Sequence, residues 1–209
     1  MSVITVARQL GAGGGEVATR VAEALGWPLL DRSLVERIAS EMHVPPEEVV
    51  KLDERTETFI ERIGLYLSEG FPETLMVSPE PPHSPEGAAR AARRIIAAVV
   101  EEGPCVIVGH GAQCVLHHDP RAFHVLVHAP FPLRVERAAE RFNVDAAQAE
   151  GIIRKSDTDR SGYIRAHFER EWLNPALYHL CVDGVRLGMP AAAELVRTAA
   201  LEHFERDRR

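Results

Sequence analysis

The chain has 209 residues, enough for one α/β domain with a sizeable hydrophobic core and few for two. Its formal net charge of −7 argues against nucleic acid as the main partner, because phosphate backbones are usually bound by basic surfaces. The sequence contains neither the ~20 consecutive apolar residues of a membrane span nor, at its start, the pattern of a secretory signal. We therefore expect a cytoplasmic protein without a membrane partner.

Short apolar runs alternate with helical patterns along the chain. Runs at residues 3–7, 106–109 and 123–128 predict buried strands, with a weaker one at 177–182 and a short one just before Asp31. The helical patterns cover residues 16–25, 33–41, 46–64, 85–101, 132–141, 146–169 and 190–205. This alternation predicts a mostly parallel sheet covered on both faces, with a ligand at the carboxyl ends of its strands.

The sequence does not decide the role of two segments. Residues 76–87 are rich in proline and lack an apolar face, which fits either a plain connector or part of a loop that closes over a substrate. The apolar helix at about residues 191–204 could pack on its own domain or on a second copy of the chain in a homodimer. Because a surface helix normally buries one apolar stripe in its own domain, the first arrangement is favoured.

A glycine cluster at residues 11–15 follows the first predicted strand and opens a helical pattern. This is the layout of a phosphate-binding loop, in which successive backbone N–H groups meet an anion at a helix N-terminus. A tight strand-to-helix turn without a ligand also uses glycine, so the loop alone leaves both possibilities open. Any cations that assist a phosphate site must be mainly arginines, since Lys51 and Lys155 are the only lysines.

Four blocks of sequence add a more specific signal. "ITVARQLGAGGGEVATRVAEALGWPLLDR" is followed by "VIVGHGAQCVL", "HVLVHAPFPLRVERAAERF" and "IIRKSDTDRSGYIRAHFEREWLNPALYHLCVDGVRL". In this order and spacing they resemble the cytidylate kinase-like family, a branch of the P-loop nucleoside monophosphate kinases. The resemblance implies a single domain over residues 1–209 with a P-loop kinase-type three-layer fold: a mostly parallel five-stranded sheet with helices on both faces. It also implies a helical insertion of the nucleoside monophosphate-binding type at about residues 44–87 and a helical lid at about 152–170.

The resemblance places the ATP phosphates on the glycine loop, whose residues are Gly11, Ala12, Gly13, Gly14, Gly15 and Glu16. Here "GAGGGE" stands where cytidylate kinases have "GAGKGT", so Gly14 replaces the lysine that neutralises phosphate and Glu16 replaces the hydroxyl that holds Mg²⁺. The family often carries an arginine near the loop, but its place here is Gly15. Arg8 is therefore the nearest candidate cation. Glu16 is either a Mg²⁺ ligand or an ordinary acidic residue in the first turn of a helix.

The predicted lid is rich in charge. The resemblance implies that Lys155 and Arg160 contact phosphate, that Arg154 and Arg165 lie behind them, and that Asp157 and Asp159 orient these cations. A simple ion pair between Arg154 and Asp157 on a solvated helix face would explain part of the same pattern. Arg137 and Arg141 are likewise hinge candidates under the resemblance, or members of a solvated face.

On the acceptor side, the resemblance implies contacts from Asp31, Arg32 and His110, the last of which stands where the family commonly has an arginine between two glycines. The leading hypothesis is ATP- and Mg²⁺-dependent phosphoryl transfer to a nucleoside monophosphate, with CMP as the first choice and Arg8, Lys155 and Arg160 as catalytic residues. One alternative is a nucleotide- or anion-binding module without turnover, which the missing lysine and hydroxyl favour. Another is a kinase of a non-nucleotide small molecule, which the poorly matched residues 44–103 allow.

Overall fold

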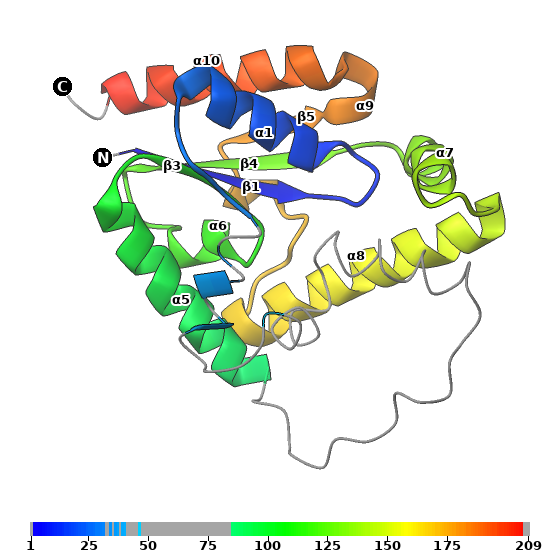
Figure 1. The fold of residues 1–209 in the computed structure, drawn as a ribbon, viewed down its shortest axis with the longest axis horizontal. Helices are drawn as coiled ribbons and strands as arrows, with labels where there is room; N and C mark the ends of the chain where they lie inside the picture. Colours follow the sequence, from blue (N-terminus) through cyan, green and yellow to red (C-terminus); the bar gives the residue numbers. More distant parts are fainter. Residues whose placement is uncertain are drawn as a thin grey trace.

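The computed structural model describes residues 2–31, 34, 36–37, 39–40, 46 and 85–206, with the backbone alone at 85–88. At its centre is a sheet of five parallel strands in the order β2-β3-β1-β4-β5 (Figure 1). The strands are β1 (Val3–Arg8), β2 (Leu29–Leu30), β3 (Cys105–Val108), β4 (Ala122–His128) and β5 (Leu180–Asp183). Because β1 lies in the middle, the loop that leaves its carboxyl end opens at the centre of the sheet.

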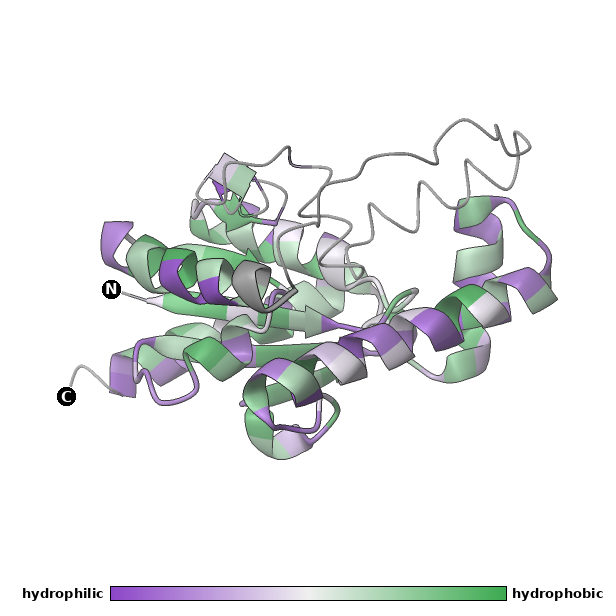
Figure 2. Ribbon diagram, turned by 90° about the horizontal axis from the view of Figure 1, so that it is seen from below, coloured by the Kyte–Doolittle hydropathy of each residue, from purple (hydrophilic) through white to green (hydrophobic). Residues whose placement is uncertain are grey.

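Helices cover both faces of the sheet (Figure 1). On one face lie α1 (Gly14–Leu25) and α10 (Met189–Arg206), and on the other lie α5 (Pro85–Glu102) and the short α6 (Ala112–Val115). All six residues of β1 are buried, as expected for a parallel strand covered on both faces. Figure 2 shows the result: the strands are largely hydrophobic, whereas the helices also carry hydrophilic residues. The expected three-layer α/β kinase fold is confirmed.

The sequence explains where α1 and α10 begin, end and pack. The inward face of α1 carries Val17 and Val21, and Gly26 caps the end of α1 with a left-handed backbone (φ 64°) that suits glycine. α10 buries Val196 and Phe204 against the same core. The tail helix therefore packs on its own domain, which is the arrangement that the sequence favoured.

A hairpin of two helices projects beyond the carboxyl ends of the strands. α7 (Phe131–Phe142) is followed by α8 (Ala146–Phe168), which runs back past the ends of the strands toward α5 (Figure 1). The turn is well specified: Asn143 adopts a left-handed conformation, and Asp145 and Gln148 form a reciprocal capping box at the start of α8. α8 lies where the resemblance places the lid.

Most of the predicted elements within the described residues agree with the structure. The last strand starts later than predicted, because Pro175–Leu177 forms a 3₁₀ helix and β5 begins only at Leu180. The four-residue helices α6 and α9 (Gly184–Leu187) were not predicted, since so short a segment shows no helical period. Residues 85–87 form the first turn of α5, so the prediction of a loop over 76–87 is wrong at that end.

The remaining predictions concern residues in the middle of the chain. The described positions among residues 33–41 are helical, as predicted. The predicted helix at 46–64, apart from the helical residue 46, and residues 76–84 of the predicted loop lie outside the described residues. None of the described helices combines the length and hydropathy of a membrane-spanning segment.

Candidate functional site

The glycine loop connects the carboxyl end of β1 to α1. Gly11 and Gly13 adopt left-handed conformations, with φ of 79° and 82°. Gly13 caps α1 and, having no side chain, makes no capping hydrogen bond to the first amides of the helix. Because these amides have no intrahelical acceptor and the helix dipole adds positive potential, the loop has the chemistry of an anion site.

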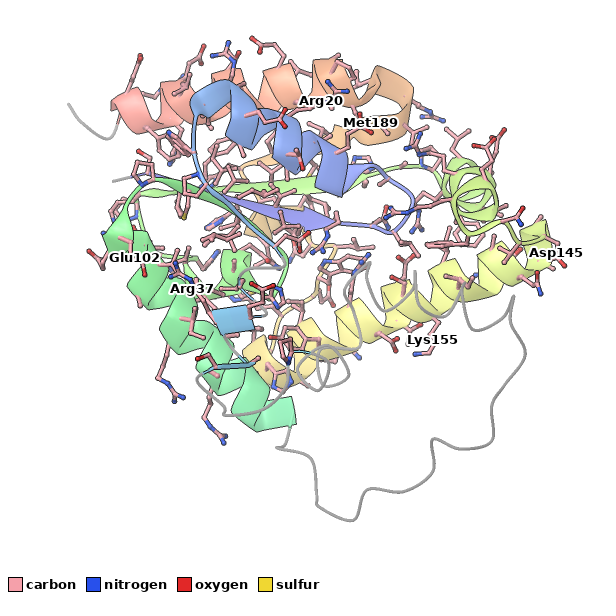
Figure 3. The ribbon with its side chains drawn as sticks, in the orientation of Figure 1. Arg20, Arg37, Glu102, Asp145, Lys155 and Met189 are labelled. Atoms are coloured by element: carbon pink, nitrogen blue, oxygen red, sulfur yellow. The ribbon has the colours of Figure 1, made fainter. Side chains whose placement is uncertain are left out.

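The loop is also tightly packed on its underside. A Cβ on Gly11 would lie 2.7 Å from the carbonyl oxygen of Arg134, and one on Gly13 would lie 2.3 Å from Met189 Cε. Figure 3 shows Met189 at the start of α10, beside the first turn of α1. Backbone packing therefore requires glycine at position 11 whether or not a phosphate binds, whereas at position 13 the methionine tip can move and the positive φ favours glycine.

Arg8 provides a buried cation beside this loop. It is the last residue of β1, and its side chain is 5% exposed. The side chain passes beneath Gly14 and extends toward the ends of β3 and β2, where Nη1 lies close to Gly109 and Nη2 is 3.6 Å from Asp31 Oδ1. Among the described residues, none offers a hydrogen-bond acceptor to its Nε. The predicted proximity of Arg8 to the loop is thus a feature of the structure.

Arg160 reaches the same place from α8. It is 7% exposed, its Nη1 donates a hydrogen bond of 3.0 Å to the carbonyl oxygen of Arg8, and its Cζ lies 5.9 Å from the ring centre of Trp172. The side chain of Arg160 is thus buried and fixed by these contacts, and it does not lie on the solvent-exposed surface of a lid.

Arg8 and Arg160 line one pocket at the carboxyl ends of β1 and β3. His110, Gln113, Tyr163 and Trp172 form much of the rest of its wall. No carboxylate belongs to the lining in the part of the chain that the structure describes. Two arginines, aromatic walls and hydrogen-bonding side chains suit a small anionic ligand.

His110 enters this pocket from an unusual turn. Gly109, His110 and Gly111 are three successive residues with positive φ, at 77°, 54° and 70°. Such a conformation costs energy at a residue with a side chain, although histidine tolerates it better than most. The turn directs the chain from β3 into α6 and places His110, 7% exposed, against the pocket. The predicted acceptor residues Asp31 and His110 thus lie near Arg8, whereas Arg32 lies outside the described residues.

The other predicted lid cations lie on the outer side of α8. Lys155 is exposed, forms a 2.7 Å ion pair with Asp159, and points away from the sheet in Figure 3. Arg154 pairs with Glu150 at 2.6 Å and covers the ring of Phe131, with Cζ 4.6 Å from the ring centre. Arg165 is exposed as well. The structure therefore brings Arg160 to the pocket without Lys155, Arg154 or Arg165.

Asp157 has a different partner from the ones that the sequence suggested. It forms a bidentate pair with Arg134 of α7, with hydrogen bonds of 3.0 and 2.8 Å, and does not pair with Arg154. Arg134 lies on the same helix as the hinge candidates Arg137 and Arg141, yet those two are exposed whereas Arg134 is 3% exposed. Its spacing of four residues from Ala138, which is also buried, was the available signal that it faces inward.

Glu16 is the carboxylate nearest to the loop in sequence. Its side chain is 48% exposed, and its Oε1 accepts hydrogen bonds of 3.0 and 2.9 Å from Arg20 on the next turn of α1. Within the described residues, no group of three or more histidine, cysteine or acidic side chains converges on a metal position. A single carboxylate still fits Mg²⁺ that is bound mainly through substrate phosphates and water.

The strand order, the glycine loop between β1 and α1, and the helix that passes the strand ends define an α/β protein with the P-loop kinase fold. The model of the cytidylate kinase-like family matches residues 3–184, and the chain belongs to this family. The resemblance that the sequence motifs suggested is confirmed. Among proteins of curated function, none matches the sequence.

Two solved structures show how widely the fold is shared. The chain is similar to an uncharacterized protein from Eubacterium ventriosum, with a TM-score of 0.67 and 19% identity over 96% of this chain and 98% of that one. It is also similar to a shikimate kinase from Bacteroides thetaiotaomicron, with a TM-score of 0.53 and 16% identity over 98% of each chain. At these identities the likeness concerns the fold.

Proposed function

We propose that the protein is an ATP- and Mg²⁺-dependent phosphotransferase that moves the γ-phosphoryl group of ATP to a small acceptor, with CMP as the first candidate. The observation that supports this proposal most directly is that Arg8 and Arg160 line the same pocket, next to the glycine loop. Burying a charged group costs several kcal/mol, and an ion pair at 3.6 Å with a partly exposed carboxylate offsets only part of that cost. Asp31 is such a partner for Arg8, so a bound anion would stabilise the site further.

The proposed reaction needs positioning and charge neutralisation more than proton transfer. A phosphate oxygen of a nucleoside monophosphate is already a nucleophile. It forms a bond to the γ-phosphorus while the bond from that phosphorus to the bridging oxygen of ADP breaks, and ADP leaves. The loop amides would hold the phosphates of ATP, and Arg8 and Arg160 would neutralise charge on the acceptor side.

The remaining predicted residues have supporting roles in this proposal. Glu16 would hold Mg²⁺ together with the phosphates of ATP; the metal neutralises phosphate charge when bound. Asp31 and His110 would contact the acceptor from the ends of β2 and β3. Lys155, Arg154 and Arg165 are exposed on α8 and the half-buried Asp159 pairs with Lys155, so these residues would contact nucleotide only after α8 moves toward it.

The test is ADP release by the purified protein with ATP and Mg²⁺ across a panel of nucleoside monophosphates. Arg8→Met and Arg160→Met should each lower acceptor-dependent kcat/KM by about a hundredfold or more, because each removes a buried cation from the reacting charges. The control is Arg197→Met, which removes an arginine paired with Glu194 on α10 and should leave the activity unchanged. Equal loss in all three variants, or no loss in the first two, would contradict the assignment.

A binding module without turnover is the second candidate, and the absence of a loop lysine at Gly14 favours it. The same assay separates the two functions when it is combined with calorimetric titration of ADP. Binding of ADP without ADP release from ATP for any acceptor would support the binding module. Turnover only when a non-nucleotide acid or alcohol replaces the monophosphate would show a kinase with another acceptor.

A further inference from the structure

Arg134 lies between the glycine loop and the lid helix. Its Nη1 donates hydrogen bonds to the carbonyl oxygen of Leu10, at 3.4 Å, and to Asp157 Oδ1, at 3.0 Å, while Nη2 donates to Asp157 Oδ2 at 2.8 Å. The side chain is 3% exposed. One guanidinium therefore joins three parts of the molecule: the residue just before the glycine loop, α7 and α8.

The apolar contacts of Leu10 also connect the start of the loop to α7 and α8. Its fully buried side chain belongs to a cluster with Ala138 of α7 and Ile153 of α8. The next residue, Gly11, approaches the backbone of α7 so closely that a Cβ would meet the carbonyl oxygen of Arg134 at 2.7 Å. The start of the loop is thus packed against the α7–α8 hairpin on its apolar side and hydrogen-bonded to it on its polar side.

The charge of Arg134 makes Asp157 essential to this arrangement. A buried guanidinium is tolerated when its charge is paired, and here both Nη atoms face one carboxylate in a bidentate geometry, whereas the buried Nε has no hydrogen-bond partner among the described residues. Without the negative charge of Asp157, the guanidinium would be driven toward water or another anion. The hydrogen bond to Leu10 O, which is long, would be lost first.

We propose that Arg134 is a positioning residue for the glycine loop and that Asp157, on the lid helix, holds it in place. The orientation of α8 is then coupled to the loop amides through Asp157, Arg134 and Leu10. The inference rests on the proposed function in one respect, namely that the loop amides bind nucleotide phosphate. Binding that depends on several convergent N–H groups weakens when the loop that presents them is less rigid.

The experiment compares Asp157→Asn and Arg134→Lys with a matched control, Asp119→Asn. Asp119 also pairs with an arginine through two nitrogens, with Arg121 Nε at 2.9 Å and Nη2 at 2.8 Å, but it lies just before β4, at the opposite end of the sheet. Arg134→Lys keeps the charge and loses the planar fork, and it serves as the second variant if Asp157→Asn does not fold.

The first readout is hydrogen exchange of the ligand-free proteins, followed by mass spectrometry. Both site variants should exchange the amides of residues 10–16 about tenfold faster than the wild type while β1 and β4 keep their protection, because the opening is local. The control variant should leave residues 10–16 unchanged. The second readout is calorimetric titration of ADP, whose dissociation constant should rise about tenfold in the site variants alone.

The outcomes distinguish this inference from the proposed function. Unchanged exchange at residues 10–16, or faster exchange spread evenly through the chain, would overturn the positioning role and leave the pair as a structural contact. If the loop responds but the wild type does not bind ADP, the positioning role stands and the proposed function fails. If the wild type binds ADP and all three variants bind it equally well, the positioning role fails and the proposed function stands.

Discussion

The side chain of Arg8 fills the space into which a side chain at Gly14 would extend. A Cβ on Gly14 would lie 2.3 Å from Arg8 Cβ and 3.0 Å from Arg8 Cγ. These atoms are next to the backbone of β1, so they cannot swing aside as the tip of a side chain would. Arg8 and a lysine at position 14 therefore cannot occupy this space together. In this chain the cation beside the loop comes from the end of β1.

The first prediction follows from this exclusion. Gly14→Lys should destabilise the protein by about 1–3 kcal/mol, as overpacking does, and lower the midpoint of urea unfolding. Gly14→Ala should also destabilise it, although alanine in place of glycine normally favours a helix. In an Arg8→Gly background, which removes the contact, Gly14→Lys should cost much less stability than it does in the wild type. Wild-type stability of Gly14→Lys alone would show that the two side chains do not compete.

The second prediction concerns Gly109, whose added Cβ would meet the guanidinium of Arg8 at Nη1. Gly109→Ala should shift this flexible end of the side chain within the pocket. The control is Gly26→Ala, because Gly26 also has a positive φ but a Cβ there meets no atom within 4 Å. Both variants should lose about 1–2 kcal/mol to backbone strain, and only Gly109→Ala should lose acceptor-dependent activity as well. Equal activity losses in the two variants would argue against a role for the position of Arg8.

The third prediction uses a histidine in the amino-terminal half of β4, away from the pocket at the carboxyl ends of the strands. Burial, with a further contribution from His179, lowers the pKa of His124 from 6.5 to about 4. Thr5 Oγ1 is 2.8 Å from its Nδ1, and the His124 amide donates to His179 Nδ1. Protonation of either ring would disturb this arrangement.

As the pH falls from about 6.5 to about 4, the unfolded chain binds a proton at His124 that the folded protein excludes, so the free energy of unfolding decreases. The loss is on the order of 3 kcal/mol and levels off below the folded pKa. His124→Asn should remove this part of the pH dependence in urea unfolding, whereas substitution of the exposed His118 by asparagine should leave it. The same slope in wild type and His124→Asn would contradict the assignment.

The sequence predicted the layers and the loop because both depend on local patterns. Buried parallel strands appear as continuous apolar runs, and the glycine loop follows directly from the chain order of β1 and α1. The exclusion between Arg8 and Gly14 could not be predicted in this way. It depends on where a side chain at a strand end passes relative to the loop, and no spacing rule contains that information.

The lid shows the same limit. Its arginines, Lys155 and acids are close in sequence, but a helix distributes them over all its sides, so that Arg160 faces the pocket and Lys155 faces solvent. The partner of Asp157 is 23 residues away on another helix. Local spacing suggested Arg154 as the partner of Asp157, whereas in the folded protein that partner is Arg134.

The last prediction concerns Glu16 and the metal. In the proposed function, Glu16 supplies a carboxylate to Mg²⁺ beside the ATP phosphates; in the alternative, it is a solvated acid at the start of α1, paired with Arg20. Glu16→Gln should therefore weaken binding of ATP in the presence of Mg²⁺ and leave or strengthen binding in EDTA, because a bare carboxylate repels phosphate. Glu194→Gln is the control, since Glu194 is also exposed and paired with an arginine on its own helix. Calorimetric titration of ATP with and without Mg²⁺ measures both effects. Equal affinity of wild type and Glu16→Gln in Mg²⁺ would assign the residue to helix stabilisation, and the phosphate charge would then be met by arginines and backbone amides.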